Sequence, residues 1–318
     1  MYRFEDYSNM LRDPVRTVAY RKALDRLVKP DSVVLDLGAG TGAFALYAAS
    51  LGARRVYAVE LSPLLDYGKR EAERMGLGER IRFHFGRSED FEVDEPANIL
   101  VSDLRGALPF FGSAFDTLND ALRRLLSPDA SILPSRDRLF VAPIEDEHWY
   151  QAQVREPWIG GEIGLDMPVL ARVEANMPRR PVNSGMMPSM EGKQFAEIDY
   201  KNGPSIPEPA QIEWRVTTPT TVHAWLVWFE AELLPGITIS AAPGLFSTPQ
   251  VYGRLLFPVS SPIMLVPGDL LRVRIAVLCL NGSFTYRWTS SAVDSGGRNR
   301  SLIHQHSGCE YFLGLGTP

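Results

Sequence analysis

A glycine-rich turn between an apolar strand and an apolar helix constrains this chain more than any other feature. The stretch VVLDLGAGTGAFALYAA places Gly38, Gly40 and Gly42 at that junction. Glycines there permit a tight turn, and their missing Cβ atoms let a ligand lie against the backbone. The next apolar run, RVYAVE, ends in Glu60, eighteen residues after Gly42, where a carboxylate can accept hydrogen bonds from ribose hydroxyls. The pattern predicts a nucleotide site on an α/β sheet.

The spacing of the glycines separates two classes of nucleotide cofactor. Dinucleotide-binding turns read G-x-G-x-x-G and bring a pyrophosphate onto a helix N-terminus. The motif here is D-x-G-x-G-x-G, with Asp36 two residues before the first glycine. A carboxylate at that position faces a pyrophosphate unfavourably, but it can hold the ammonium group of a methionine moiety. The spacing therefore favours S-adenosylmethionine over a nicotinamide dinucleotide.

The composition of the chain changes near residue 135. Before it, short apolar runs alternate with charged, helix-forming segments, which is typical of βαβ units around a doubly wound parallel sheet. After it, runs rich in Val, Ile, Thr, Trp and Phe lie between glycines and prolines, as in an antiparallel sandwich or barrel. Residues 158–209 contain seven prolines and several methionines, which indicates an arm or insertion that packs on another surface.

Charge and hydropathy argue against several kinds of partner. The 33 Lys and Arg and 38 Asp and Glu give a net charge of -5 without a long basic run, so we expect no nucleic acid partner. The longest apolar stretch, residues 43–49, is too short to cross a bilayer, and MYRFEDYSNM lacks the apolar core of a secretory signal. Two cysteines do not make a disulfide framework. We therefore expect a cytoplasmic protein with no membrane association.

Segments from both halves of the chain resemble the protein arginine methyltransferases. NMLRDPVRTVAYRKAL is similar to the family's helix over the cofactor, GRSEDF to its adenine-binding turn and ANILVSDLRGALPFF to its acceptor loop. WIGGEIGLDMPVLARVEANMP is similar to the family's dimerisation arm, and AWLVWFEAEL to a central barrel strand. The resemblance implies a Rossmann-like class I methyltransferase domain followed by an antiparallel β-barrel domain with an inserted dimerisation arm.

The resemblance also implies domain bounds and cofactor contacts. It implies cofactor-covering helices over residues 1–29, a cofactor domain over 30–134, and a barrel acceptor domain over 135–318 with its arm at about 158–182. Arg16 would meet the methionine carboxylate of S-adenosylmethionine, and Glu89, in one turn with Ser88, would accept the exocyclic amine of adenine. With the glycine motif, the predicted cofactor contacts are Arg16, Asp36, Gly38, Gly40, Gly42, Glu60, Ser88 and Glu89.

The acceptor half departs from the family pattern. The family holds a guanidinium with two glutamates on one loop, where this chain has Asp103 and Gly112. The family's Thr-His-Trp loop aligns with residues 250–252, which read QVY, and Arg105 replaces an apolar Met. A buried cation 4 Å from a guanidinium would repel it by about 4 kcal/mol at an effective dielectric of about 20. Asp103 and Arg105 are our candidates for residues at the reacting centre.

Two hypotheses account for this altered acceptor half. Replacement acids could come from Asp116, Glu230 or Glu232. Alternatively, Arg105 and Arg254 make the pocket favourable for an anionic acceptor, such as a carboxylate-bearing metabolite.

Three functions are compatible with the sequence. The leading one is S-adenosylmethionine-dependent methyl transfer to a nitrogen of a peptide or arginine-like acceptor by a homodimer. The second is N- or O-methylation of a small metabolite, and the third is a catalytically silent, cofactor-binding dimeric module.

Two further groups of residues have open interpretations. The aromatic residues Tyr2, Phe4 and Tyr7 either line the cleft or pack the first helix down. The motif H-x-H-x-x-C formed by residues 304–309 has the residue types of a zinc site, but in a polar tail we expect no metal.

Overall fold

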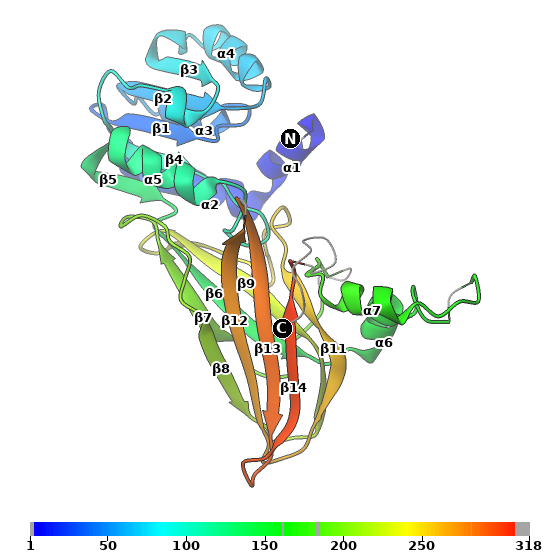
Figure 1. Ribbon diagram of the computed structural model, residues 1–318. Helices are drawn as coiled ribbons and strands as arrows, with labels where there is room; N and C mark the ends of the chain where they lie inside the picture. Colours follow the sequence, from blue (N-terminus) through cyan, green and yellow to red (C-terminus); the bar gives the residue numbers. More distant parts are fainter. Residues whose placement is uncertain (1–2, 161, 182–184, 281, 309–318) are drawn as a thin grey trace.

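Two domains of different architecture share one elongated molecule (Figure 1). The computed structural model describes residues 3–160, 162–181, 185–280 and 282–308. An α/β domain occupies one end, and long antiparallel strands form the other. The parallel sheet ends at Leu133 and the first antiparallel strand begins at Arg136.

The first domain is a five-stranded parallel sheet in the order β3-β2-β1-β4-β5. Every residue of its central strand β1 is buried, because helices cover both faces of the sheet. The elements of this domain are α1 (Phe4–Arg12), α2 (Pro14–Leu27), β1 (Val33–Leu37), α3 (Ala43–Ser50), β2 (Arg55–Glu60), α4 (Leu65–Arg74), η1 (Gly78–Arg80), β3 (Ile81–Phe85), η2 (Ser88–Asp90), β4 (Ala97–Ser102), α5 (Ala114–Arg124) and β5 (Leu126–Leu133).

The strand order indicates which edge of the parallel sheet can hold a ligand. Strand β1 pairs with β2 on one side and with β4 on the other, all in parallel. The loops that follow β1 and β4 therefore leave the same edge of the sheet as neighbours. In open parallel sheets, ligands bind where the order of strands reverses in this way.

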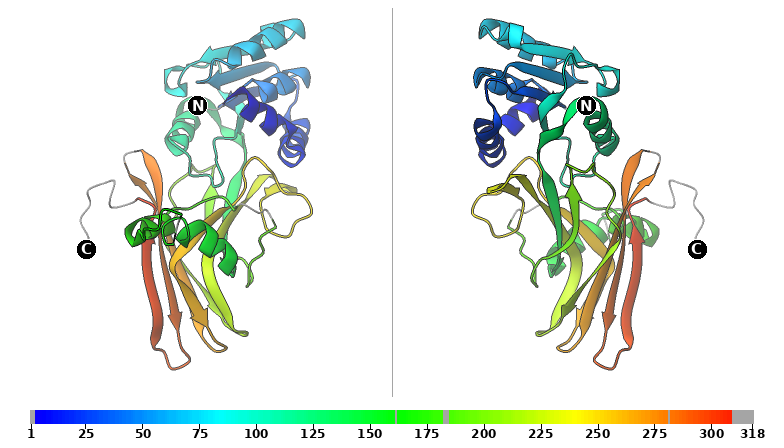
Figure 2. Two further views of the ribbon diagram at one scale, coloured as in Figure 1. Left: turned by 90° about the vertical axis from the view of Figure 1, so that its right-hand side faces the viewer. Right: turned by 90° about the vertical axis from the view of Figure 1, so that its left-hand side faces the viewer.

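The start of α2 fixes the two domains to each other. Asp13 caps the helix by accepting hydrogen bonds from its first-turn amides through Oδ1, and Pro14 occupies the first helical position. Through Oδ2 the same carboxylate accepts from the amides of Gln250 (2.6 Å) and Val251 (3.1 Å). In Figure 2, α1 and α2 (dark blue) accordingly lie beside the yellow loop that precedes β11.

The second domain consists of two antiparallel sheets. One has the order β10-β9-β6-β7, with β11 also paired to β9, and the other has the order β14-β13-β12-β8. Their strands are β6 (Arg136–Ile144), β7 (Lys193–Asp199), β8 (Ala210–Arg215), β9 (Thr220–Leu234), β10 (Ile237–Ser240), β11 (Leu255–Leu265), β12 (Leu270–Leu280), β13 (Ser283–Val293) and β14 (Asn299–His306).

Large aromatic side chains join the two sheets. Trp225 of β9 is fully buried, stacks on Trp214 of β8 at 5.5 Å between ring centroids, and donates a hydrogen bond to Ser290 Oγ at 2.8 Å. Trp288 of β13 donates to the carbonyl of Pro258 at 3.2 Å. Buried tryptophans with satisfied N–H groups contribute both apolar burial and a fixed orientation.

The side segment between β6 and β7 contains α6 (Glu147–Tyr150), the π-helical turn η3 (Gln151–Arg155) and α7 (Pro168–Ala175). It projects from the flank of the second domain (Figure 1). Ile163 and Leu165 expose 69% and 62% of their surfaces. The segment therefore presents apolar residues outward, as expected for an arm that packs on another surface.

The fold class expected from the sequence is confirmed. Strand β14 does not belong to the runs rich in Val, Ile, Thr, Trp and Phe, because it lies at the edge of its sheet, where most of its residues are polar and one face is solvated. Among the helices in the described parts of the chain, none is both long enough and apolar enough to span a bilayer.

Candidate active site

A cavity of about 1110 Å³ lies at the carboxyl edge of the parallel sheet. Its walls come from α1 and α2, the turn after β1, the end of β2 and the loop after β4. Residues 250–252 of the second domain and Arg180 complete them. A ligand on the glycine turn and a molecule held by the second domain would therefore share one space.

The glycine turn depends on glycine for two reasons. Gly38, Gly40 and Gly42 have backbone φ values of 75°, 60° and 76°, which residues with a side chain rarely adopt. A Cβ on Gly38 would lie 2.5 Å from Leu104 Cδ2, and one on Gly40 would lie 2.6 Å from a ring carbon of Tyr7. Gly38 and Gly40 line the cavity, whereas Gly42 caps α3 outside its lining.

Two carboxylates lie at the ends of neighbouring strands in the cavity wall. Glu60 accepts hydrogen bonds from the amides of Gly40 and Ser62, each at 2.8 Å, which fixes the orientation of its carboxylate. Each carboxylate oxygen keeps a second acceptor position for a ligand hydroxyl. Asp36 is 3% exposed and accepts from the amide of Ala45 at 2.9 Å. Burial raises the pKa of Asp36 to about 7, so a cationic ligand group beside it would favour its ionised form.

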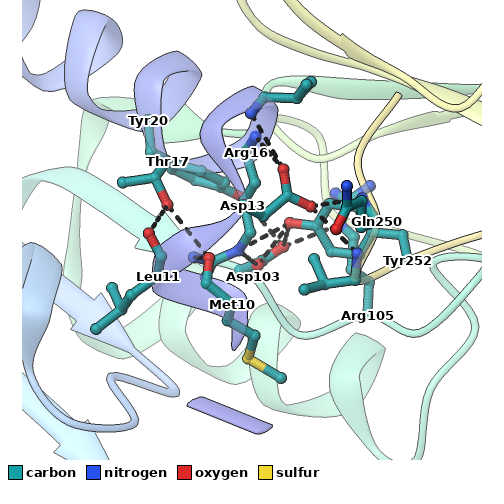
Figure 3. A network of polar contacts seen from close by, with 12 residues as sticks. Met10, Leu11, Asp13, Arg16, Thr17, Tyr20, Asp103, Arg105, Gln250 and Tyr252 are labelled. Carbon is teal, nitrogen blue, oxygen red and sulfur yellow. Dashed lines mark hydrogen bonds and ion pairs between the residues drawn. The ribbon is translucent and has the colours of Figure 1, made fainter. Parts of the chain in front are cut away.

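Asp103 follows β4 directly and lines the cavity. Side chains from several elements form hydrogen bonds with its carboxylate (Figure 3). Arg16 Nε donates to its Oδ2 at 2.7 Å. The hydroxyl of Tyr252 lies 2.8 and 2.7 Å from its two oxygens, and the hydroxyl of Tyr20 donates to Oδ1 at 3.3 Å. The carboxylate thus joins the first helices, the acceptor loop and the second domain.

Arg105 extends this network into the interior. Its Nε lies 3.3 Å from Asp103 Oδ1, and its Nη1 donates to Asp137 Oδ1 at 2.8 Å. Its guanidinium lies 5.0 Å from the ring centroid of Phe229, and Tyr200 donates to Asp137 Oδ2. With Arg16, the network contains two arginines and two aspartates, so its formal charges cancel.

Burial and mutual charge set the protonation states in this network. Burial opposes the charged form of Arg16, but Asp103, Tyr252 and Tyr20 together outweigh burial and raise the pKa of Arg16 above its ordinary value. Burial and the same carboxylate raise the pKa values of Tyr20 and Tyr252. Both phenols therefore remain neutral hydrogen-bond donors, and the guanidinium remains cationic.

The structure brings most of the predicted site residues together. Those that line the cavity are Arg16, Asp36, Gly38, Gly40, Glu60, Asp103 and Arg105. Ser88 and Glu89 lie on η2, outside the cavity lining, where Glu89 pairs with Arg87 at 2.9 Å. Contact of a cofactor with any of the eight predicted residues, Ser88, Glu89 and Gly42 included, stays a prediction.

The two hypotheses about the altered acceptor half name five residues, of which Arg105 alone lines the cavity. None of the acids considered as replacements lines it, neither Asp116, Glu230 nor Glu232. Glu230 instead accepts from Ser240, and Glu232 pairs with Arg138 at 3.4 Å. Arg254 lies outside the lining and donates to the backbone carbonyls of residues 241 and 242. Asp103 and Arg105 are therefore the acceptor-loop charges to consider.

The structure locates some of the residues whose interpretation the sequence left open. Tyr7 lines the cavity, whereas Phe4 is 65% exposed and does not, and Tyr2 lies outside the described residues. His304 and His306 belong to β14, and His304 contacts Thr289 at 3.0 Å.

The structure does not test the zinc interpretation of residues 304–309 as a whole. Cys309 lies outside the described residues. Within the part of the chain that the structure describes, no group of three potential ligands could hold a metal ion.

Sequence reasoning missed several residues that build this site. Asp13 has a local signal, since Asp-Pro before an apolar helix marks a cap. Asp137 also has one, since it shares alternate positions of β6 with Leu139 and Val141 and therefore lies on the same inward face of the strand. Tyr252 has none, because its contact with Asp103 spans 149 residues of sequence.

Comparisons with known proteins agree with this architecture. Residues 34–129 match the family model described as a methyltransferase domain. The probable histone-arginine methyltransferase 1.4 of Arabidopsis thaliana is 31% identical over 96% of this chain and 61% of its own length. Protein arginine N-methyltransferase 1 of Schizosaccharomyces pombe is 27% identical over 85% of this chain and 83% of its own length.

Solved structures show the same fold at lower identity. A chain of the Trypanosoma brucei PRMT1 enzyme-prozyme heterotetrameric complex with AdoHcy has a TM-score of 0.83 and 23% identity, covering 96% of this chain and 98% of that chain. Arabidopsis thaliana protein arginine methyltransferase 10 has a TM-score of 0.78 and 21% identity, with the same coverage.

The matches extend across both domains of the chain. The chain spans about 60% of the length of the two Arabidopsis histone-arginine methyltransferases that it matches over nearly all of its residues. On these similarities, the chain belongs to the protein arginine methyltransferase family.

Proposed function

We propose that this protein transfers a methyl group from S-adenosylmethionine to a nitrogen of a peptide or arginine-like acceptor. The observation that carries the proposal is the single cavity in which the glycine turn and Glu60 face Asp103 and residues 250–252 of the second domain. Cofactor and acceptor groups would meet there without crossing bulk solvent.

The residues of the cavity fit S-adenosylmethionine. Glu60 has acceptor positions for ribose hydroxyls, and Asp36 offers a buried carboxylate to the ammonium group. Arg16 offers a guanidinium to the methionine carboxylate. Two solved relatives carry AdoHcy or SAH in their descriptions. Bound there, the cofactor supplies a methyl group on a positively charged sulfur.

The chain's own contribution is orientation and charge. Methyl transfer is an in-line displacement, so a fixed acceptor nitrogen provides much of the acceleration. Asp103 is fixed by Arg16, Tyr20 and Tyr252, and any remaining acceptor position on its carboxylate can orient an N–H of the acceptor. Position 112 is glycine, so this loop supplies one carboxylate rather than two.

We further infer that the protein forms a homodimer through its side segment. Ile163 and Leu165 are exposed on that segment, and Tyr67 and Phe85 expose 58% and 64% of their surfaces on the first domain. Burying these two apolar surfaces against each other would join two copies. The double variant Ile163→Asp with Leu165→Asp should be monomeric in light scattering, whereas Met264→Asp, at an exposed position on β11, should remain dimeric. A dimeric double variant would contradict this arrangement.

Turnover with defined acceptors tests the proposed activity. Purified protein, S-adenosylmethionine and arginine-containing peptides should release AdoHcy faster than protein and cofactor alone. Asp103→Asn should lower that acceptor-dependent rate at least about tenfold while leaving AdoHcy affinity within about twofold, because charge-assisted hydrogen bonds are the stronger ones. Cofactor binding without acceptor-dependent release would instead indicate a silent binding module.

A further inference from the structure

Most charged side chains of the cavity wall are already engaged. Asp13 accepts from backbone amides of both domains, Glu60 from two amides and Asp36 from one. Asp103 is paired with Arg16 and Arg105. The remaining acid of the wall, Asp6, bonds to the backbone and side chain of Arg3.

Two arginines of the wall remain. Arg12 and Arg180 both line the cavity and are exposed. Neither side chain makes a hydrogen bond or ion pair within the described ranges of the chain. Arg12 and Arg180 are therefore the two cations of the wall whose guanidinium groups are available to an anionic group of a ligand.

Both arginines border the same loop of the second domain. Arg12 precedes Asp13, whose carboxylate binds the amides of Gln250 and Val251. The Cδ of Arg180 lies 3.8 Å from the position of a Cβ on Gly253. The backbone N–H and carbonyl of Arg179 each form a hydrogen bond with the backbone of Leu256. These two bonds hold the backbone next to Arg180 in place.

We propose that the methyl acceptor carries a carboxylate near the methylated nitrogen, and that Arg12 and Arg180 bind this carboxylate. This inference rests on the proposed function and adds the substrate class. Within the inner network each arginine is already paired with an aspartate, whereas two free guanidiniums can bind a carboxylate by charge and by paired N–H donors. The carboxylate could belong to an acidic residue that flanks the acceptor in a peptide, or to the acceptor's own α-carboxylate.

Equilibrium binding in the presence of AdoHcy tests the inference independently of turnover. The ligands are two peptides with the same central arginine, one flanked by aspartates and one by lysines. Free arginine and its carboxamide form a second pair. The wild-type protein should bind the carboxylate-bearing member of at least one pair about tenfold more tightly. The pair that shows this preference identifies the source of the carboxylate.

Variants then assign the preference to the two arginines. Arg12→Gln and Arg180→Gln should each weaken binding of the preferred ligand about fivefold, the value of an exposed ion pair of about 1 kcal/mol. Arg180→Glu should reduce or reverse the preference between aspartate and lysine flanks. Arg274→Gln removes an exposed arginine on the outer face of β12 and should change nothing.

Three results have distinct meanings. Equal affinity of the wild type for both members of each pair would overturn the inference, as would a preference that survives Arg180→Glu and Arg12→Gln together. Unchanged AdoHcy affinity and melting temperature show that the variants are folded. A carboxylate preference without AdoHcy release would support the inference while refuting the proposed activity.

Discussion

Substitution of Arg105 tests whether its buried positive charge compensates the buried carboxylate of Asp137. Its side chain is 4% exposed and that of Asp137 is 0% exposed, and the two are 2.8 Å apart. Arg105→Met would leave Asp137 with the hydroxyl of Tyr200 as its remaining side-chain hydrogen-bond donor among the described residues. Leaving one buried charge uncompensated costs about 3–5 kcal/mol. Against a total stability of about 5–15 kcal/mol, this loss is large.

A second substitution should recover much of this loss. Asp137→Asn removes the orphaned charge, and the amide oxygen can still accept from Tyr200. The double variant with Arg105→Met should therefore lie within about 2 kcal/mol of the wild type, because neutral replacements for a buried ion pair are often tolerated. The coupling between the two positions should amount to at least about 2 kcal/mol.

Urea unfolding of the four proteins of this cycle measures the coupling. All six tryptophans lie beyond residue 134, so their fluorescence reports the second domain, while circular dichroism reports both domains. As a control, Arg54→Met breaks the exposed pair with Glu95, which is 2.7 Å long, and should cost at most about 1 kcal/mol. Additive effects of Arg105→Met and Asp137→Asn would refute the balanced-charge reasoning.

Three further predictions concern the cavity. Burial raises the pKa of Asp36 to about 7, above the ~3.9 of an aspartate in an unfolded chain. Between these two pH values the folded state therefore binds a proton on Asp36 that the unfolded state has lost. Raising the pH from about 4 to about 7 should thus lower the free energy of unfolding by up to about 4 kcal/mol relative to Asp36→Asn; parallel pH profiles would contradict this. Gly40→Ala should displace the ring of Tyr7 and cost about 1–3 kcal/mol in urea unfolding, and an unchanged midpoint would argue against the packing of α1 on the turn. Glu60→Gln should weaken AdoHcy binding about tenfold or more in calorimetry, and equal affinity would place the ribose elsewhere.

The sequence predicted those parts of the fold and site that are encoded locally. The turn at Gly38 and Gly40 and the acid at Glu60 follow from a strand, a turn and a second strand within thirty residues. The parallel and antiparallel halves follow from periodicity. The resemblance of these halves to one family added the side segment and the position of Arg16 in the cavity wall.

The balance of charge in the site could not be predicted in the same way. It depends on pairs far apart in sequence, such as Arg16 with Asp103, 87 residues away. Whether Arg105 repels an acceptor or neutralises an interior carboxylate depends on Asp137, which a different domain supplies. No local pattern reports that pairing, so Arg105 looked like an unpaired cation in the sequence alone.

The central claim is that the cavity at the glycine turn holds the adenosyl cofactor. Calorimetric titration with AdoHcy tests it most directly, using the wild type and Glu60→Ala. We expect the wild type to bind one AdoHcy molecule per chain in the micromolar range, and Glu60→Ala to bind it at least about tenfold more weakly. Absence of binding by the wild type, or equal affinity of the variant, would contradict the claim.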